Sequence, residues 1–260
     1  MDTDGIRRDK GRIARFMAGL ILFIMIFAAA SYFIAVVMTN HFSEITEGRP
    51  FIDVSADESL PMLVIDPGHG GEDGGASSGE VLEKDLNLSV SEDIYYLCVM
   101  AGIPAKMTRR TDTALYDLYG DLADYSGKKK TYDLTNRVKF VKENDAAIYL
   151  GVHMNKFPRS EYKGLQVYYS PNANESEELA GIIQSAARRH IDPENSREIK
   201  RATKSIFVLD RLSVPAVLVE CGFLSNPGDL EALCDPSYRL HLAAVITSAV
   251  ASYECGEAGY

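Results

Sequence analysis

The chain has 260 residues, of which 46% are hydrophobic and 25% are charged, and its formal net charge is −10 at pH 7. This is the composition of an ordinary folded protein, so it excludes wholesale disorder and fibrous repeats. Asp and Glu outnumber Lys and Arg by 37 to 27, which argues against a protein that binds nucleic acid through the phosphate backbone.

The first feature along the chain is an apolar run over residues 16–38 that contains no charged side chain. It is long enough for a transmembrane helix, which needs roughly 20 apolar residues. Five Lys or Arg residues precede it, and this excess predicts a cytoplasmic N-terminus with everything after the run outside. A cleaved signal peptide is the alternative, because Ala28, Ala29 and Ala30 resemble a cleavage site, although the apolar run continues beyond them.

These features divide the chain into four segments. A basic cytoplasmic stub is predicted at 1–15, a membrane anchor at 16–38, a polar tether at 39–60 and one folded domain at 61–255. Whether the apolar run is kept or cleaved, we expect the folded domain to be exported. The predicted location is therefore a membrane-anchored protein whose domain lies outside the cytoplasm.

Within the folded domain, short apolar runs alternate with stretches of helical periodicity. Strands are predicted at 62–65, 103–107, 147–152, 164–169 and 214–219, and helices at 84–101, 132–144, 176–190 and 228–253, the last of these broken near Pro236. This alternation predicts an α/β domain with a mainly parallel, twisted sheet that is flanked by helices on both faces. The polar, Tyr-rich segment 116–130 is expected to be a substrate-facing loop.

Two histidines follow predicted strands. His69 lies in a Gly-rich loop after the first strand, and His153 follows the strand at 147–152. The loop fits neither the phosphate-loop nor the dinucleotide-binding spacing of glycines. Sites in open α/β sheets form at the carboxyl ends of strands, so two histidines there predict a divalent metal, zinc first. Two unrelated polar loop residues are the alternative.

Two carboxylates and one arginine complete the set of candidates. Glu83 begins a predicted helix and is either a third metal ligand, a helix-capping carboxylate or part of a solvated helix face. Glu220 directly follows an apolar strand, where a charged group is rarely placed without a reason. It is either a general base or one half of an ion pair. Arg137 is the arginine most expected to point from its helix toward the site.

Taken in order, five motifs resemble the zinc-dependent N-acetylmuramoyl-L-alanine amidases of the Amidase_3 family over residues 62–253. The motifs are Asp66-Pro67-Gly68-His69-Gly70-Gly71, Glu83-Lys84-Asp85-Leu86-Asn87-Leu88, Met107-Thr108-Arg109, Val152-His153-Met154-Asn155 and a segment from Pro215 to Pro227 that contains Glu220.

The resemblance implies that His69, Glu83 and His153 bind zinc (Zn²⁺) and that Glu220 is the catalytic carboxylate. It also implies hydrolysis of the amide between the lactyl group of muramic acid and L-alanine in peptidoglycan. Arg137 and Asn155 are predicted to contact the substrate. The family's common Ser-x-His-Ala-Asn is Gly-Val-His-Met-Asn at 151–155, a departure that leaves the ligand in place and affects the lining of the pocket.

A narrower resemblance is to the spore-cortex amidases of endospore formers. It depends on Asp133-Leu134-Thr135-Asn136-Arg137 after the Tyr-rich segment and on residues 153–160, which precede Lys163-Gly164. Membership implies removal of peptides from muramic acid so that muramic-δ-lactam can form, in the intermembrane space of the forespore, with an accessory lipoprotein as partner. A zinc carboxypeptidase acting on wall peptides and a non-catalytic cell-wall scaffold are the alternative functions.

Overall fold

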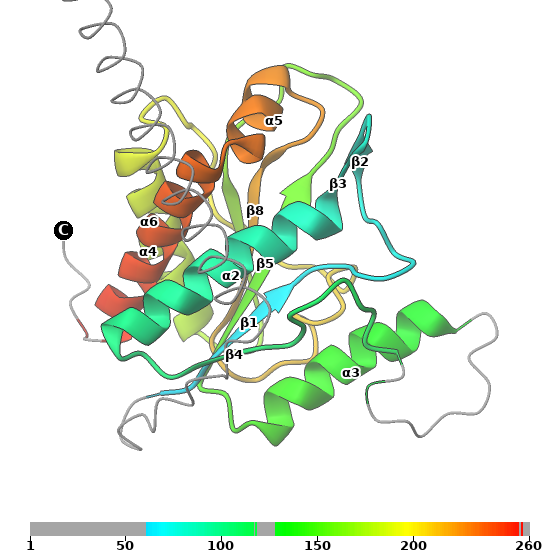
Figure 1. Ribbon diagram of the computed structural model, residues 1–260. Helices are drawn as coiled ribbons and strands as arrows, with labels where there is room; N and C mark the ends of the chain where they lie inside the picture. The colour runs from blue at the N-terminus through cyan, green and yellow to red at the C-terminus, as the bar shows by residue number, and fades with distance from the viewer. Residues whose placement is uncertain (1–60, 117, 119–127, 255, 257–260) are drawn as a thin grey trace, which may run out of the picture. The chain divides into compact units, whose positions relative to one another are not determined.

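The computed structural model describes residues 61–116, 118, 128–254 and 256 (Figure 1). The predicted stub, anchor and tether at 1–60 lie outside the described residues, as does most of the Tyr-rich segment. Within the described part of the chain, no helix is both long and apolar enough to cross a bilayer. The membrane anchor at 16–38 therefore stays a prediction.

A six-stranded sheet in the order β4-β1-β5-β8-β6-β7 organises the domain. Its strands are β1 (Leu63–Pro67), β4 (Ala105–Met107), β5 (Ile148–Asn155), β6 (Gln166–Tyr169), β7 (Lys200–Arg201) and β8 (Ala216–Phe223), and a separate hairpin pairs β2 (Ser77–Ser78) with β3 (Val81–Leu82). The four strands from β4 to β8 run parallel, whereas β6 is antiparallel to β8. The predicted mainly parallel sheet is confirmed.

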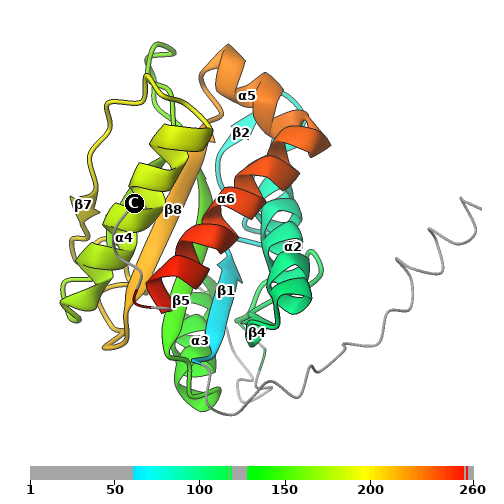
Figure 2. The same ribbon diagram turned by 90° about the vertical axis from the view of Figure 1, so that its left-hand side faces the viewer.

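Helices cover the two faces of this sheet unequally. The helices are α2 (Glu83–Ala101), α3 (Lys129–Glu143), α4 (Glu175–His190), α5 (Pro227–Cys234) and α6 (Pro236–Glu254). Helices α2, α4 and α6 pack together on one face, over the larger hydrophobic core (Figure 2). Helix α3 covers the other face with the irregular segment 202–214, so the second layer is only partly helical.

The break between the last two helices has a local cause. The Asn226 side chain accepts hydrogen bonds from the backbone N–H groups of Gly228 and Asp229, which caps α5, and Pro227 occupies its first turn. Pro236 then begins α6 because proline lacks the N–H that a continuous helix would need there.

Side-chain alternation along β5 decides which face carries the site. Ile148, Leu150 and Val152 lie in the larger core, whereas Tyr149 lies in the smaller core beside α3. Because successive strand residues point to opposite faces, His153 shares the α3 face with Tyr149. The same alternation in β8 places Glu220 on that face.

Both key strands are longer than predicted. Strand β5 continues to Asn155 and β8 to Phe223, so His153 and Glu220 lie inside strands and are directly paired across them. The expectation that each residue follows the end of its strand is therefore wrong. The polar side chains interrupt the apolar pattern, but the backbone pairing continues through them to an irregularity before Asn155.

Candidate metal centre

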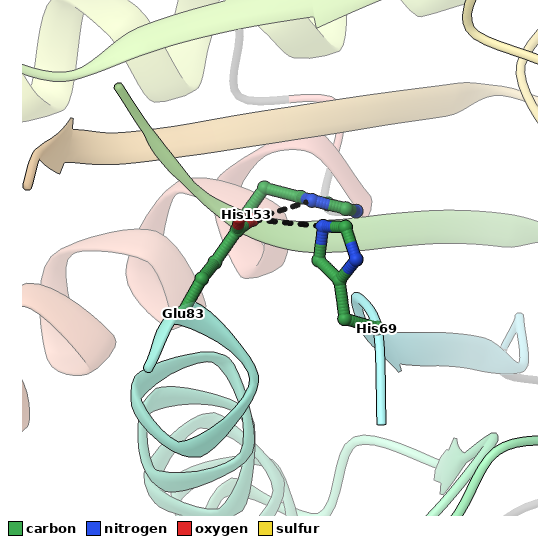
Figure 3. A group of neighbouring side chains, drawn as sticks. All are labelled: His69, Glu83 and His153. Atoms are coloured by element: carbon green, nitrogen blue, oxygen red, sulfur yellow. Dashed lines mark hydrogen bonds and ion pairs between the residues drawn. The ribbon is translucent and has the colours of Figure 1, made fainter. Parts of the chain in front are cut away.

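The three residues predicted to bind metal lie together at the carboxyl end of the parallel strands (Figure 3). One ligand atom from each of His69, Glu83 and His153 lies within 4.8 Å of the others. Glu83 Oε1 is 3.2 Å from His69 Nε2 and 3.0 Å from His153 Nδ1. The loop after β1, the first residue of α2 and strand β5 each contribute one ligand, so the cluster exists only in the folded chain.

Glu83 is held by backbone donors as well as by the two histidines. The N–H of Ala76 donates to Oε2 at 2.7 Å, and the N–H of Met154 donates to Oε1 at 3.2 Å. Burial alone would raise the pKa of Glu83, but the hydrogen bonds from His153 and His69 outweigh it and hold the pKa below its usual range. The carboxylate is therefore ionised and fixed, as a metal ligand must be.

His69 occupies a tight loop that is closed by two backbone hydrogen bonds between Gly70 and Asp73, at 2.9 and 3.1 Å. Its own φ is 62°, a left-handed conformation that non-glycine residues adopt rarely. Asp73 Oδ2 lies 3.0 Å from His69 Nδ1, which leaves Nε2 facing Glu83. Burial opposes the charged imidazole, but the hydrogen bonds with Glu83 and Asp73 raise the pKa of His69.

Two glycines make room for the ligands. A Cβ at Gly68 would lie 2.2 Å from Cε1 of His153, and a Cβ at Gly75 would lie 2.5 Å from Oε2 of Glu83. Both distances are far inside normal van der Waals contact. The Gly-rich composition of this loop therefore follows from close packing against the ligand side chains, and Gly75 also has φ of +67°.

Arg137 holds the backbone around His69 in place. Its guanidinium is buried and pairs with Asp66 at 2.5 Å and Asp133 at 2.8 Å, and it donates to the carbonyl oxygens of Pro67 at 2.9 Å and His69 at 2.7 Å. The two carboxylates raise the pKa of Arg137 although burial opposes them. These contacts give Arg137 a positioning role toward the His69 loop, and Arg137 also lines the cavity beside the ligands, so its predicted substrate contact stays a prediction.

Glu220 faces the same centre from β8. It lines a cavity of ≈ 230 Å³ together with His69 and His153, and Ile206, Phe207 and Val208 contribute apolar lining. Burial raises the pKa of Glu220 to about 7, with His153 opposing the shift and Glu83 adding to it. Glu220 Oε2 is buried and has no hydrogen-bond partner among the described residues. A buried, unpartnered carboxylate oxygen beside a ligand cluster is suited to receive a proton from a bound water.

The structure brings together the four residues predicted as metal ligands and catalytic carboxylate, His69, Glu83, His153 and Glu220. The sequence analysis assigned no role to Asp66 or Asp73. Asp66 lies in β1 directly before the Gly-rich loop and Asp73 lies within that loop, and an Asp four residues after the candidate ligand His69 was the available signal for Asp73. Asn155 lies two residues beyond His153 on the same strand, and its predicted substrate contact stays a prediction.

Comparison with known proteins identifies relatives that share this domain. The family model described as N-acetylmuramoyl-L-alanine amidase (Amidase_3) matches residues 63–252. The germination-specific N-acetylmuramoyl-L-alanine amidase of Bacillus subtilis is 34% identical over 199 residues, which cover 75% of this chain and 82% of that protein.

Two solved structures have a similar fold. The CwlD amidase from Clostridioides difficile, determined in complex with the GerS lipoprotein, has a TM-score of 0.69 and 32% identity over 74% of this chain and 98% of that one. The N-acetylmuramoyl-L-alanine amidase AmiC2 of Nostoc punctiforme has a TM-score of 0.62 and 28% identity over 74% of this chain and 96% of that one.

Proposed function

Because the chain belongs to the Amidase_3 family of N-acetylmuramoyl-L-alanine amidases and is a peptidoglycan amidase, we propose that His69, Glu83 and His153 hold a catalytic zinc ion beside Glu220. The bond cleaved is the amide between the lactyl group of muramic acid and L-alanine. The observation that carries the proposal is the convergence of the three ligand atoms within 4.8 Å.

The residues present fit zinc. Two imidazole nitrogens and one carboxylate oxygen are a donor set that catalytic zinc sites use, with a fourth position left for water or substrate. Asp73 holds the ring nitrogen of His69 that faces away from Glu83, which is the usual arrangement for a metal-binding histidine. Glu220 Oε2 is unpartnered among the described residues, so it is available for chemistry and not committed to an ion pair.

The groups around the scissile bond have separate roles in the hydrolysis. Zinc, when bound, supplies a Lewis acid that polarises the amide carbonyl and acidifies water. Glu220 accepts the proton of the attacking water and later delivers it to the departing nitrogen of L-alanine. Arg137 and Asp66 keep the His69 loop in place, since Arg137 donates to the carbonyl of His69 itself.

Substitution of Glu220 tests this assignment. The full-length Glu220→Gln chain should retain zinc and lose amidase activity on purified peptidoglycan, with products identified by mass spectrometry. His69→Ala is the matched control, since it should lose zinc and activity together. Full activity of Glu220→Gln would refute the role of this carboxylate, and products cut between amino acids would identify a wall-peptide carboxypeptidase instead.

The biological substrate proposed is spore-cortex peptidoglycan. Support comes from the similarity to a germination-specific amidase of Bacillus subtilis. Digestion of spore-cortex and vegetative peptidoglycan by the same preparation is the test, and a clear preference for vegetative material would contradict the proposal.

We propose an accessory lipoprotein as partner because the Clostridioides difficile relative was solved with one. Purified full-length chain that is fully zinc-loaded and active alone would show that no partner is required.

The proposed location places residues 1–15 in the cytoplasm, 16–38 in the membrane and the domain at 61–255 outside, joined by the tether at 39–60. The support is the charge and hydropathy of the sequence. Protease added to intact protoplasts should remove the domain and spare the N-terminal stub. Release of the whole domain into the medium without protease would favour the cleaved signal peptide.

A further inference from the structure

An aromatic surface with two stacked arginines lies beyond the metal ligands, and the mechanism does not use it. This aromatic rim consists of Phe157, Tyr162 and Phe223 with Arg159 and Arg197. The Phe157 and Tyr162 rings meet edge to face at 4.7 Å between centroids. Arg159 lies 5.2 Å over Tyr162, and Arg197 lies 4.4 Å over Phe223. Phe223 is buried beneath Arg197, so the surface that the rim presents consists of Phe157 and the half-buried Tyr162 with the guanidinium groups of Arg159 and Arg197.

The rim is connected to the candidate metal centre through β5, which ends two residues before Phe157, and through β8, which ends at Phe223. Phe157 follows His153 by four residues and Phe223 follows Glu220 by three, so each lies within about 14 Å of the site along the chain. Arg197 Nη1 donates to Gln166 Oε1 at 3.0 Å, and Gln166 is paired with Glu220 across β6 and β8. A polymer whose scissile bond sits at Glu220 therefore passes within reach of the rim.

The part of the rim around Phe157 is both held in place and exposed. The N–H of Phe157 donates to Ser225 Oγ at 3.1 Å, and Asn226 Nδ2 donates to the carbonyl of Ser160 at 2.7 Å, which ties the segment after β5 to the turn before α5 (Figure 1). The Phe157 side chain nevertheless remains 45% exposed. An immobilised, exposed aromatic ring loses little conformational freedom when it binds a ligand.

The charges around the rim are largely compensated within the protein. Arg159 pairs with Glu161 at 2.6 Å, and Lys163 lies 4.0 Å from Asp192 and 3.9 Å from Glu194. Arg197 already donates from Nε to the carbonyl of Lys163 at 2.7 Å. The carboxylates of Glu161, Asp192 and Glu194 thus offset Arg159 and Lys163, whereas the hydrogen bonds of Arg197 go to neutral oxygens. The surface therefore combines aromatic faces with guanidinium donors, which suits a ligand with apolar faces and hydroxyl groups.

We propose that the aromatic rim binds sugar rings of the peptidoglycan glycan strand, next to the muramic acid whose amide is cleaved. The inference rests on the proposed function, since it takes the orientation of the substrate from the role of Glu220. Sugar rings have apolar C–H faces that stack on aromatic rings, and their hydroxyl groups accept hydrogen bonds from guanidinium groups. The rim then distinguishes a polymeric substrate from a small one.

Binding is measured without turnover, using the full-length chain in detergent with the Glu220→Gln substitution as parent. Cosedimentation with insoluble peptidoglycan gives the affinity. Adding Phe157→Ala should weaken binding by about tenfold, the value of one aromatic contact. Phe157→Trp should bind within about twofold of the parent. Met100→Ala is the matched control, because Met100 is 83% exposed at the opposite end of α2 from Glu83 and should not change binding.

Competition identifies the ligand. Glycan strands stripped of peptide should displace the parent chain, and free stem peptide should not. The proposal is overturned if Phe157→Ala binds like the parent with an unchanged melting temperature, if only stem peptide competes, or if the parent shows no binding. The proposed function is tested separately with the wild-type chain. If that chain releases no L-alanine amino termini from the same peptidoglycan, the proposed function fails, whatever the binding results are.

Discussion

Replacing Gly75 by alanine tests whether the ligand cluster is packed as the structure describes. A Cβ at this position would lie 2.5 Å from Oε2 of Glu83 and 2.7 Å from Cδ2 of His69. Non-bonded carbon contacts prefer about 3.5–4.0 Å, so both ligand side chains must move by about 1 Å. Functional sites tolerate displacements of only about 0.5 Å, and we expect zinc affinity to fall by at least 10-fold, a loss of about 1.4 kcal/mol.

The backbone contributes separately, because Gly75 has φ of +67° and a left-handed conformation costs a non-glycine residue about 1–2 kcal/mol. Gly79 separates the two effects, since it has φ of +58° and nothing lies within 4 Å of a Cβ built there. Gly79→Ala should therefore lose a similar amount of stability and keep its zinc affinity.

The assay is titration of the metal-free full-length chains with zinc against a chromogenic chelator, alongside thermal melts of the metal-free forms. Gly75→Ala should be the weaker zinc binder of the two variants, and its metal-free form should melt no higher than that of Gly79→Ala, because displacing Glu83 and His69 adds to the backbone cost. Equal zinc affinity of Gly75→Ala and Gly79→Ala would refute the packing of Glu83 and His69 against this glycine.

Three further predictions follow from the same contacts. Asp73→Asn should weaken zinc binding by about 10–100-fold while the metal-free protein melts unchanged, because Asp73 orients His69 through the ring nitrogen Nδ1. Unchanged zinc affinity in the chelator titration would contradict that role. Arg137→Met leaves Asp66 buried without its cation, which should cost about 3–5 kcal/mol in urea unfolding, and a loss below about 1 kcal/mol would show that the pair is dispensable. Zinc at a concentration of about 1,000 times its dissociation constant should stabilise the folded chain by about 4 kcal/mol. Removing it with a chelator should therefore lower the melting temperature by about 10 °C. A melting temperature that does not change with chelator would argue against the site.

The order of strands and helices and most of the candidate site could be predicted from local signals. Apolar periodicity located the strands that became β1, β5 and β8, because burial of a strand or a helix face imposes its spacing on the chain. The starts of the last two helices are also set locally. Asn226 caps the beginning of α5, and Pro236 begins α6 because proline lacks the N–H that a continuous helix would need. The ligand His69 was found because it follows a strand in a Gly-rich loop.

Prediction failed where a side chain's role depends on partners far along the chain. The partners of Arg137 could not be found locally, because Asp66, 71 residues away, and the carbonyl of His69 bind its guanidinium; its predicted substrate contact stays a prediction. Strand ends were misplaced at His153 and Glu220 because hydropathy records which residues are apolar and not which backbone groups are paired. Exposure of Phe157 is likewise a property of the assembled surface.

The sequence by itself determined the α/β architecture, the motif residues and their order, since periodicity, caps and turn chemistry act over a few residues. Tertiary structure alone decided that Glu83, His69 and His153 converge, that Glu220 is paired with His153 and unpartnered at Oε2, and that Arg137 supports the loop. The reason is physical: these relations depend on strand register and on the packing of α2 and α3 against the sheet. Register and packing are set by contacts between residues far apart in the chain, such as Tyr149 and Asp66, which are 83 positions apart.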